Sequence, residues 1–276
     1  MDDLAVWISG WDSVGNKCLA AQLIDWGIPH VFTHCDKTKH EPENYNFCIG
    51  RSISLGFKYI EFLDSDVSVL HRETIPKLYE VITTRDRAGS VRPWRFGEAM
   101  LASAALEEKY VDDNTAMMFR LDMGLWFDEE LLFTGWSDVD AGSEIEYLGY
   151  KNFSDRRYPV HHDMSRSCAH SQSTFLEAMK KRNKLIVDYK WWKCGRKDWH
   201  GVESYNATLP VDERIPSMNE IAAASDEKQR LFADSVHPEH GQIFLKDGEI
   251  HPNPHWKNPW IVGYNFREQW KERHGY

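Results

Sequence analysis

Short apolar runs alternate with amphipathic stretches over the first third of the chain. Leu4–Ser9, residues 30–34 and residues 58–63 are compact apolar segments, and each is a predicted strand. The spacing of apolar positions predicts helices over residues 16–26 and 47–55, each ended by a glycine. Strands that alternate with helices predict β-α-β units, and therefore an α/β fold with a mostly parallel central sheet flanked by helices.

The pattern is less regular further along the chain. Residues 74–83 and 97–110 are predicted helices, and residues 116–121 a buried strand. Two capping-box spacings, Thr174 to Glu177 and Ser217 to Glu220, predict helix starts near 175 and 218. We therefore expect a core over residues 1–167. A helical and irregular extension over 168–276 would pack on it, as an acceptor-binding part or a lid.

Composition limits the partners and the compartment. The chain has 276 residues, and 43 acidic against 33 basic residues give a formal charge of −10. This balance disfavours wholesale capture of nucleic acid or of an anionic membrane. The five cysteines form no Cys-x-x-Cys pair, the start does not resemble a signal peptide, and no apolar run is long enough to span a bilayer. A reduced, cytoplasmic protein without a membrane span is expected; the oligomeric state stays open.

The most informative motif is Asp64-Ser65-Asp66, which directly follows a predicted apolar strand. Two carboxylates at i and i+2 in a turn can converge on one hard cation, which prefers oxygen ligands and leaves positions for phosphate oxygens. The carboxyl ends of parallel strands are also where ligands bind in α/β sheets. The alternative is an ordinary solvated turn.

A second group of acids and histidines follows later. Asp138 and Asp140 come after an apolar segment, and His161 and His162 after another. Together with the earlier turn they could form one site, in which Asp66 and a histidine hold a metal beside a carboxylate that accepts a proton. The alternatives are helix capping for the two acids and a surface pair for the histidines.

Residues 50–67, GRSISLGFKYIEFLDSDV, resemble the helix, strand and DxD element of GT-A glycosyltransferases, in particular the inverting family 2. Residues 116–140, AMMFRLDMGLWFDEELLFTGWSDVD, resemble the acceptor-side segment of that family, with its Gly-x-x-Phe-Asp-Glu phrase and acidic motif. The resemblance covers roughly residues 4–167. It implies a GT-A fold and transfer of a sugar, with inversion, from a nucleotide-sugar, expected to be a UDP-sugar, with Mn²⁺ or Mg²⁺.

The resemblance also implies donor-side roles for single residues. Asp66 would bind the metal on the diphosphate, and Asp64 would contact the metal, its water shell or the ribose, with Ser65 beside them. Asp36 matches the acid that holds the nucleotide base, and Ser9 closes the first strand next to it.

On the acceptor side, Asp138 matches the general base, and His161 or His162 the late histidine of the metal site. Two motifs depart from the family: its Arg-Asn pair reads Phe47-Cys48, and its acidic motif Ser137-Asp138. Five tryptophans are candidates for stacking on a sugar or, alternatively, for core packing: Trp94, Trp126, Trp136, Trp191 and Trp192.

Two other functions stay open. Asp64 and Asp66 could belong to a phosphatase of the haloacid-dehalogenase type, although that motif usually follows the first strand of the fold. The basic and aromatic stretch over residues 180–197 could instead belong to a carbohydrate- or nucleic-acid-binding protein without turnover. As part of an enzyme, this stretch would face a glycan, a glycolipid head group or another hydroxyl acceptor; modified DNA is compatible with it but disfavoured by the net charge.

Overall fold

The computed structural model describes residues 1–10, 13–34, 36, 38–95, 106–108, 116–132, 135–162, 173–234, 243–246 and 249–252. It divides into two compact units. The first comprises residues 1–129 and 137–170, and the second residues 130–136 and 171–276. In the described residues, no helix has the length and apolar character needed to cross a membrane. The division into a core and an extension at residue 167 stays a prediction.

The first unit is built on one sheet. Its strands are β1 (Leu4–Ser9), β2 (Val31–His34), β3 (Tyr59–Asp64), β4 (Val67–Val69), β5 (Ala88–Arg95), β6 (Leu106–Glu108), β7 (Ala116–Arg120) and β8 (Lys151–His162). They lie in the order β2-β1-β3-β7-β5-β8-β4, and β6 pairs with β8. β1 pairs parallel with β2 and β3, and β5 with β8. β7 runs antiparallel between β3 and β5, so the predicted α/β fold is confirmed with a mixed sheet.

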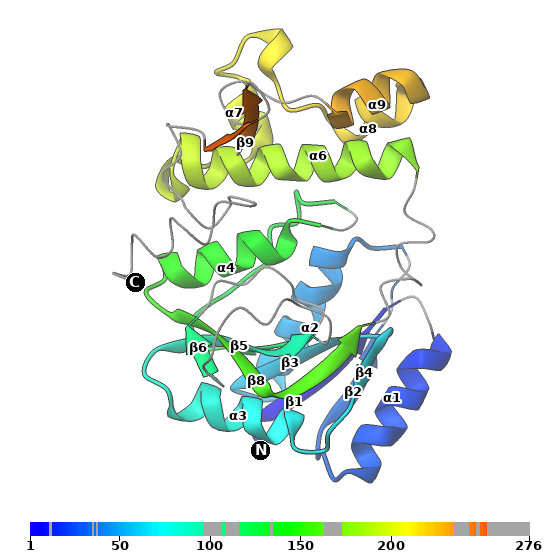
Figure 1. Cartoon of the computed structure of the whole chain (residues 1–276), viewed down its shortest axis with the longest axis vertical. Helices are drawn as coiled ribbons and strands as arrows, with labels where there is room; N and C mark the ends of the chain where they lie inside the picture. Colours follow the sequence, from blue (N-terminus) through cyan, green and yellow to red (C-terminus); the bar gives the residue numbers. More distant parts are fainter. Residues whose placement is uncertain are drawn as a thin grey trace. The chain divides into compact units, whose positions relative to one another are not determined.

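Helices cover both faces of this sheet (Figure 1). They are α1 (Ser13–Asp25), α2 (Glu41–Ser54), α3 (Thr74–Thr84) and α4 (Ser137–Tyr147). Leu19 and Leu23 of α1 and Leu78 of α3 pack with one set of strand residues. Ile49 of α2 and Ile145 of α4 pack with the residues of the opposite face. The core is therefore two apolar layers with the sheet between them, as in other α/β proteins.

Two predicted helices differ from the structure. α2 begins at Glu41 and not near residue 47, because Pro42 lies in its first turn and Glu43 forms a capping box with His40. Of the predicted helix over 97–110, residues 106–108 are the strand β6, which pairs with β8; the remainder lies outside the described residues. Pairing to a neighbouring strand overrides the helix propensity of this alanine-rich segment.

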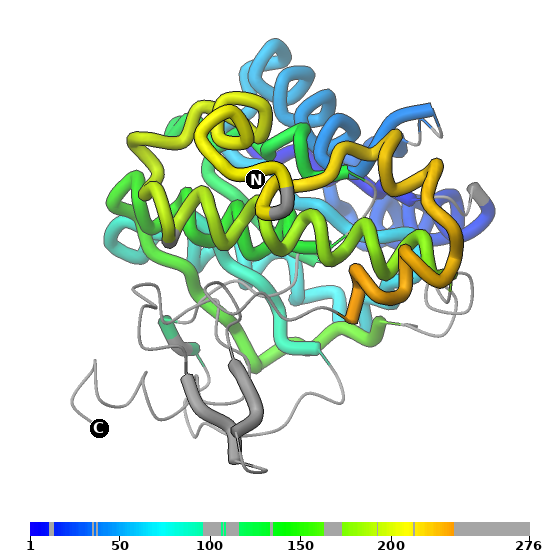
Figure 2. Tube along the Cα trace, turned by 90° about the horizontal axis from the view of Figure 1, so that it is seen from above, coloured from blue at the N-terminus to red at the C-terminus, as the bar shows by residue number. Residues whose placement is uncertain are grey.

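The second unit is mainly helical. Its elements are α6 (Thr174–Asp188), a π-helix (Tyr189–Lys193), α7 (Val202–Asn206), α8 (Met218–Ala223), α9 (Asp226–Asp234), short 3₁₀ turns at Arg196–Asp198 and Val211–Glu213, and the hairpin β9 (Ile243–Lys246) and β10 (Glu249–Pro252). α8 and α9 lie alongside α6 (Figure 2). Ile221 of α8 packs on Ala178 and Met179 of α6. The predicted starts of α6 and α8 are confirmed, although Ser173, and not Thr174, caps α6.

Candidate metal and catalytic site

The turn after β3 is fixed against the end of β1. Asp64 is the last residue of β3 and lies opposite Ser9, the last residue of β1. The amide of Ser65 donates a hydrogen bond of 3.0 Å to the carbonyl oxygen of Ser9. Gly10 follows with φ of 152°, and a Cβ atom there would lie 2.2 Å from the Ser65 hydroxyl oxygen. Only glycine permits this close approach, which holds the Asp64–Asp66 turn in place.

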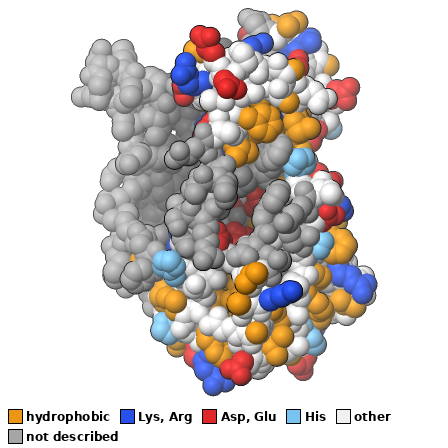
Figure 3. Space-filling model, turned by 90° about the vertical axis from the view of Figure 1, so that its right-hand side faces the viewer, with side chains coloured by type: hydrophobic (Ala, Val, Ile, Leu, Met, Phe, Trp, Pro, Cys, Tyr) orange, Lys and Arg blue, Asp and Glu red, His pale blue; other side chains and the backbone are white. Residues whose placement is uncertain are grey.

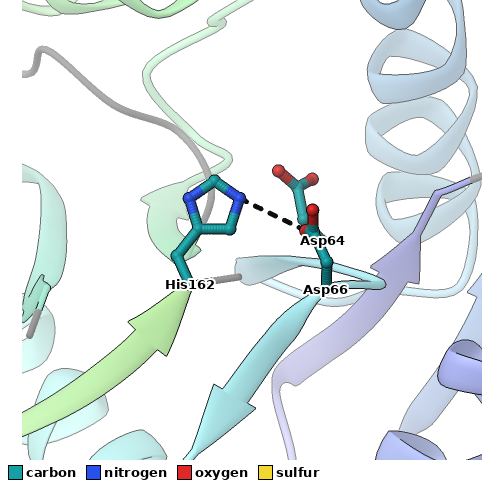
Figure 4. Close-up of side chains that lie close together, drawn as sticks. All are labelled: Asp64, Asp66 and His162. Atoms are coloured by element: carbon teal, nitrogen blue, oxygen red, sulfur yellow. Dashed lines mark ion pairs between the residues drawn. The ribbon is translucent and has the colours of Figure 1, made fainter. Parts of the chain in front are cut away.

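A strand from much later in the chain brings a histidine to this turn. β4 starts directly after Asp66 and pairs antiparallel with the end of β8, where Val67 lies opposite His162. The Nε2 atom of His162 lies 3.3 Å from an Oδ1 atom of Asp66. Figure 4 shows the imidazole directed toward both aspartates. The side chains of His162 and Asp66 are 11% and 13% exposed, so solvent screens their charges only in part.

Asp64, Asp66 and His162 form a candidate metal-binding group. Each offers a ligand atom, and these three atoms lie within 4.8 Å of one another. Two carboxylates and one imidazole fit Mn²⁺, and the oxygen ligands also fit Mg²⁺. Three protein ligands leave coordination positions for the oxygens of a substrate. The Nδ1 atom of His162 is buried and has no hydrogen-bond partner in the described residues.

His161 lies elsewhere. It pairs with Ser68 one position earlier on the ladder, and successive side chains of a strand point to opposite faces of a sheet. The side chain of His161 is exposed, and His161 is not part of the three-residue group. Of the two predicted histidines, the structure thus brings only His162 to the aspartates.

Asp138 lies in the first turn of α4, where one of its carboxylate oxygens accepts a 2.8 Å hydrogen bond from the amide of Val139. The start of a helix stabilises an ionised carboxylate. α4 is held to the sheet by Asn152 of β8, whose amide donates to the carbonyl of Gly142 at 3.2 Å. Ser90 of β5 in turn donates to the Asn152 oxygen at 2.7 Å. This buried chain of polar groups fixes the helix that carries Asp138.

The hydroxyl of Tyr45, on α2, is influenced by the charges of both Asp64 and Asp138. Nothing in the sequence indicates this relation. Its side chain is fully buried, and its hydroxyl donates a hydrogen bond of 2.9 Å to Glu41. Burial raises the pKa of the Tyr45 hydroxyl most, and the negative charges of Asp64, Glu41 and Asp138 raise it further. Asp64 and Asp138 therefore lie within electrostatic reach of one hydroxyl, although they come from different elements.

Asp36 lies beyond the end of β2, and the structure places it in a local turn. Its Oδ1 atom accepts hydrogen bonds from the amide (3.0 Å) and the hydroxyl (2.6 Å) of Thr38. These bonds hold the pKa of the Asp36 carboxyl below its usual value. Because β1 and β2 are parallel neighbours, Asp36 and Ser9 belong to the same edge of the sheet. Their roles in binding a nucleotide stay predictions.

The cations over residues 180–197 are largely engaged within their own unit. Lys184 pairs with the buried Asp188, and the amine of Lys190 lies 5.5 Å from the centre of the Trp191 ring. The amine of Lys184 also lies 5.5 Å from the Trp136 ring. On the face shown in Figure 3, basic and acidic side chains are interspersed. The described part of this stretch is thus not a simple solvated basic surface.

No protein-family model matches the sequence, and no curated protein resembles it closely enough to count as a relative. Several solved structures resemble the chain trace. A structure of GalNAc-T7 with UDP, GalNAc and Mn²⁺ is 12% identical, has a TM-score of 0.49, and the match covers 84% of this chain and 54% of that one. The mannosyltransferase PcManGT from Pyrobaculum calidifontis, with GDP-Man and Mn²⁺, is 9% identical with a TM-score of 0.48, covering 84% and 72%.

A third such structure is S. aureus TarS 1-349 with UDP-GlcNAc. It is 8% identical, has a TM-score of 0.44, and the match covers 93% of this chain and 99% of that one. Glycosyltransferases are thus among the solved structures that the chain resembles. The nucleotides, sugars and Mn²⁺ named above are ligands of those proteins.

Proposed function

We propose that this protein is a metal-dependent glycosyltransferase that moves a sugar from a nucleotide-sugar to an acceptor hydroxyl. The observation that carries the proposal is the convergence of Asp64, Asp66 and His162 at the carboxyl end of β3. Asp64 ends β3, Asp66 lies in the turn after it, and His162 ends the distant strand β8, so the three meet at the edge where α/β sheets bind ligands. Mn²⁺ or Mg²⁺ would be held by these residues.

The chain's own groups then have distinct tasks. A bound divalent cation would neutralise the charge that develops on the departing nucleoside diphosphate. Asp66 and Asp64 fix the diphosphate end of the donor, while Ser9 and Asp36 face the nucleoside. Asp138 accepts the proton of the acceptor hydroxyl as that oxygen attacks the anomeric carbon. Attack from the face opposite the diphosphate breaks the bond to the leaving oxygen and inverts the anomeric centre.

A thermal-shift screen tests this proposal. The wild type is heated with a panel of UDP-, GDP- and other nucleotide-sugars, with Mn²⁺ or with EDTA. A ligand at 100 times its Kd stabilises the folded state by about 2.7 kcal/mol, which for a chain of this size raises Tm by roughly 5 °C. We expect this rise for one donor, only with Mn²⁺. In Asp66→Ala we expect it to disappear, because the metal loses a ligand.

His161→Ala is the matched control, since His161 is adjacent in sequence but lies on the other face of β8. It should keep the full response. The proposal is wrong if no nucleotide-sugar acts with Mn²⁺, or if Asp66→Ala responds as the wild type does. Release of phosphate from a simple ester without any nucleotide-sugar would point to the phosphatase instead.

A further inference from the structure

Helix α2 has a groove on the side that faces away from the sheet. Its inward side places Tyr45, Cys48 and Ile49 in the core. The groove runs along the opposite side of the helix and has a volume of about 510 Å³. Its main lining residues are Glu43, Phe47, Gly50, Arg51, Trp126 and Glu129, named here the α2–Trp126 groove. The groove is shallow and open to solvent.

The indole of Trp126 lines this groove, and the backbone next to it is anchored to α2. Its side chain is 53% exposed, whereas the neighbouring Leu125 and Phe127 are buried. Asn46 of α2 binds the backbone of Phe127 twice, accepting from its amide and donating to its carbonyl, both at 2.9 Å. In the described residues, no aromatic ring or cation covers the indole. A large aromatic plane is thus presented to solvent on a rigid segment.

Gly50 leaves the space beside this indole open. It lies inside α2, where glycine weakens a helix relative to alanine, and its backbone is not in the left-handed region. A Cβ atom added there would meet only the Trp126 ring, at 4.0 Å, which is ordinary contact. Neither the backbone nor the packing therefore requires glycine. The missing side chain has one clear effect, which is to keep the floor of the groove low next to the ring.

The polar groups of the groove are balanced in charge. Its lining contains two cations, Lys39 and Arg51, and two acids, Glu43 and Glu129. The Glu129 carboxylate is oriented by a 2.9 Å hydrogen bond from Asn46. Carboxylates and a guanidinium around an aromatic plane match a sugar ring, which has an apolar C–H face and hydroxyls at its edge that both donate and accept. A balanced groove has no preference for a polyanion.

We propose that the α2–Trp126 groove binds one unit of a neutral saccharide. The site is separate from the Asp64, Asp66 and His162 group, because it lies on the side of α2 opposite Tyr45, whose ring packs on Phe62 of the strand that ends at Asp64. It does not depend on the proposed transfer reaction and needs no metal.

The test is binding of neutral tetrasaccharides to the full chain in EDTA. Maltotetraose, cellotetraose and chitotetraose are titrated by ligand-observed NMR and calorimetry. We expect at least one to bind, and Trp126→Ala to weaken it about tenfold or more. Gly50→Gln should do the same by filling the groove, without lowering Tm. Ile24→Ala is the matched control, since Ile24 is 60% exposed on α1, and it should leave binding unchanged.

Three results would overturn the proposal. The first is no binding of any of these saccharides. The second is binding that both groove variants retain. The third is displacement of the saccharide by UDP with Mn²⁺, which would place the sugar in the donor site. A short oligo-dT that binds the wild type but not Trp126→Ala, in place of the sugars, would assign the groove to single-stranded nucleic acid.

Discussion

Two regions of the molecule are dense in charge, and they use it differently. In the cationic segment over residues 180–197, several cations meet a group close in sequence, although Arg182 donates to the carbonyl oxygens of Glu130 and Pro216. Lys180 pairs with Glu177, Lys184 with Asp188, and Lys193 lies over the ring of Tyr189. The acidic group consists of Asp64, Asp66 and His162, and its histidine comes from a strand far along the chain from the two aspartates. Local pairs account for much of the cationic segment, whereas only the fold brings His162 to the two aspartates.

Charged clusters of these two kinds indicate different roles. A cation that meets a partner one turn away on its own helix stabilises that helix. Two carboxylates held in one turn repel each other and cost stability unless something binds them, and here a distant strand adds the imidazole of His162. The first kind of cluster is therefore an argument for structure. The second is an argument for a ligand.

The largest effect is expected at Asp138, the proposed general base. We expect Asp138→Asn to slow release of the nucleoside diphosphate from the donor by about 10²- to 10⁴-fold, because the amide cannot accept a proton. Donor affinity by calorimetry should stay unchanged. Asp122→Asn, at an acid whose side chain is 68% exposed, is the control and should turn over normally. A normal rate in Asp138→Asn would remove it as the base.

A smaller effect, on stability alone, is expected in the cationic segment. Lys184→Met removes the cation that pairs with the fully buried Asp188 and should lower the free energy of unfolding by about 1.5–3 kcal/mol. Lys180→Gln, at an exposed pair, should cost about 0.5 kcal/mol or less. Urea unfolding measures both. If Lys184→Met keeps its stability but loses retention on heparin, the segment is a binding surface and the contrast fails.

The smallest effect on stability is expected at Glu61 when it is measured at acidic pH. Glu61 lies on the same strand as Asp64. It is fully buried, neither of its carboxyl oxygens has a hydrogen bond in the described residues, and burial raises its pKa well above the usual value. Its folded pKa exceeds the unfolded one, so its contribution to stability is complete below the unfolded pKa. That contribution is lost as pH rises toward the folded pKa.

Glu61→Gln removes this titration. Compared with the wild type, it should gain relative stability as pH rises from about 5 to 9, with a difference close to its minimum at the acidic end. Thermal unfolding across that range measures it, and Asp86→Asn, at a surface acid with an 88% exposed side chain, should run parallel to the wild type. Parallel curves for Glu61→Gln would mean that Glu61 is already ionised and adds its charge to the acidic group.

Much of the fold was predictable because its patterns are local. The apolar runs of β1 and β3 and the capping box of α8 were each identified from neighbouring residues. β6 was not, since a three-residue strand owes its state to pairing with β8 rather than to its own sequence. The early start of α2 was missed although Pro42 and Glu43 marked it.

Some residues of the candidate site could also be predicted from the sequence, and others could not. The proximity of Asp64 and Asp66 was predictable, because they lie two residues apart directly after an apolar strand. The choice between His161 and His162 needed the register of β4 on β8, which a sequence alone does not contain. Tyr45 could not be predicted, because its link to Asp64 and Asp138 depends on how α2 and α4 pack on one face of the sheet.

The close approach of Gly10 to Ser65 sets a limit on redesign of the metal turn. A library that varies residues 64–66 to change metal preference would meet an obstacle at its middle position, since the Ser65 side chain already fills the space beside Gly10. Alanine and glycine should be accepted at 65, and larger residues rejected. The turn can therefore be altered in its ligands, but hardly in its width.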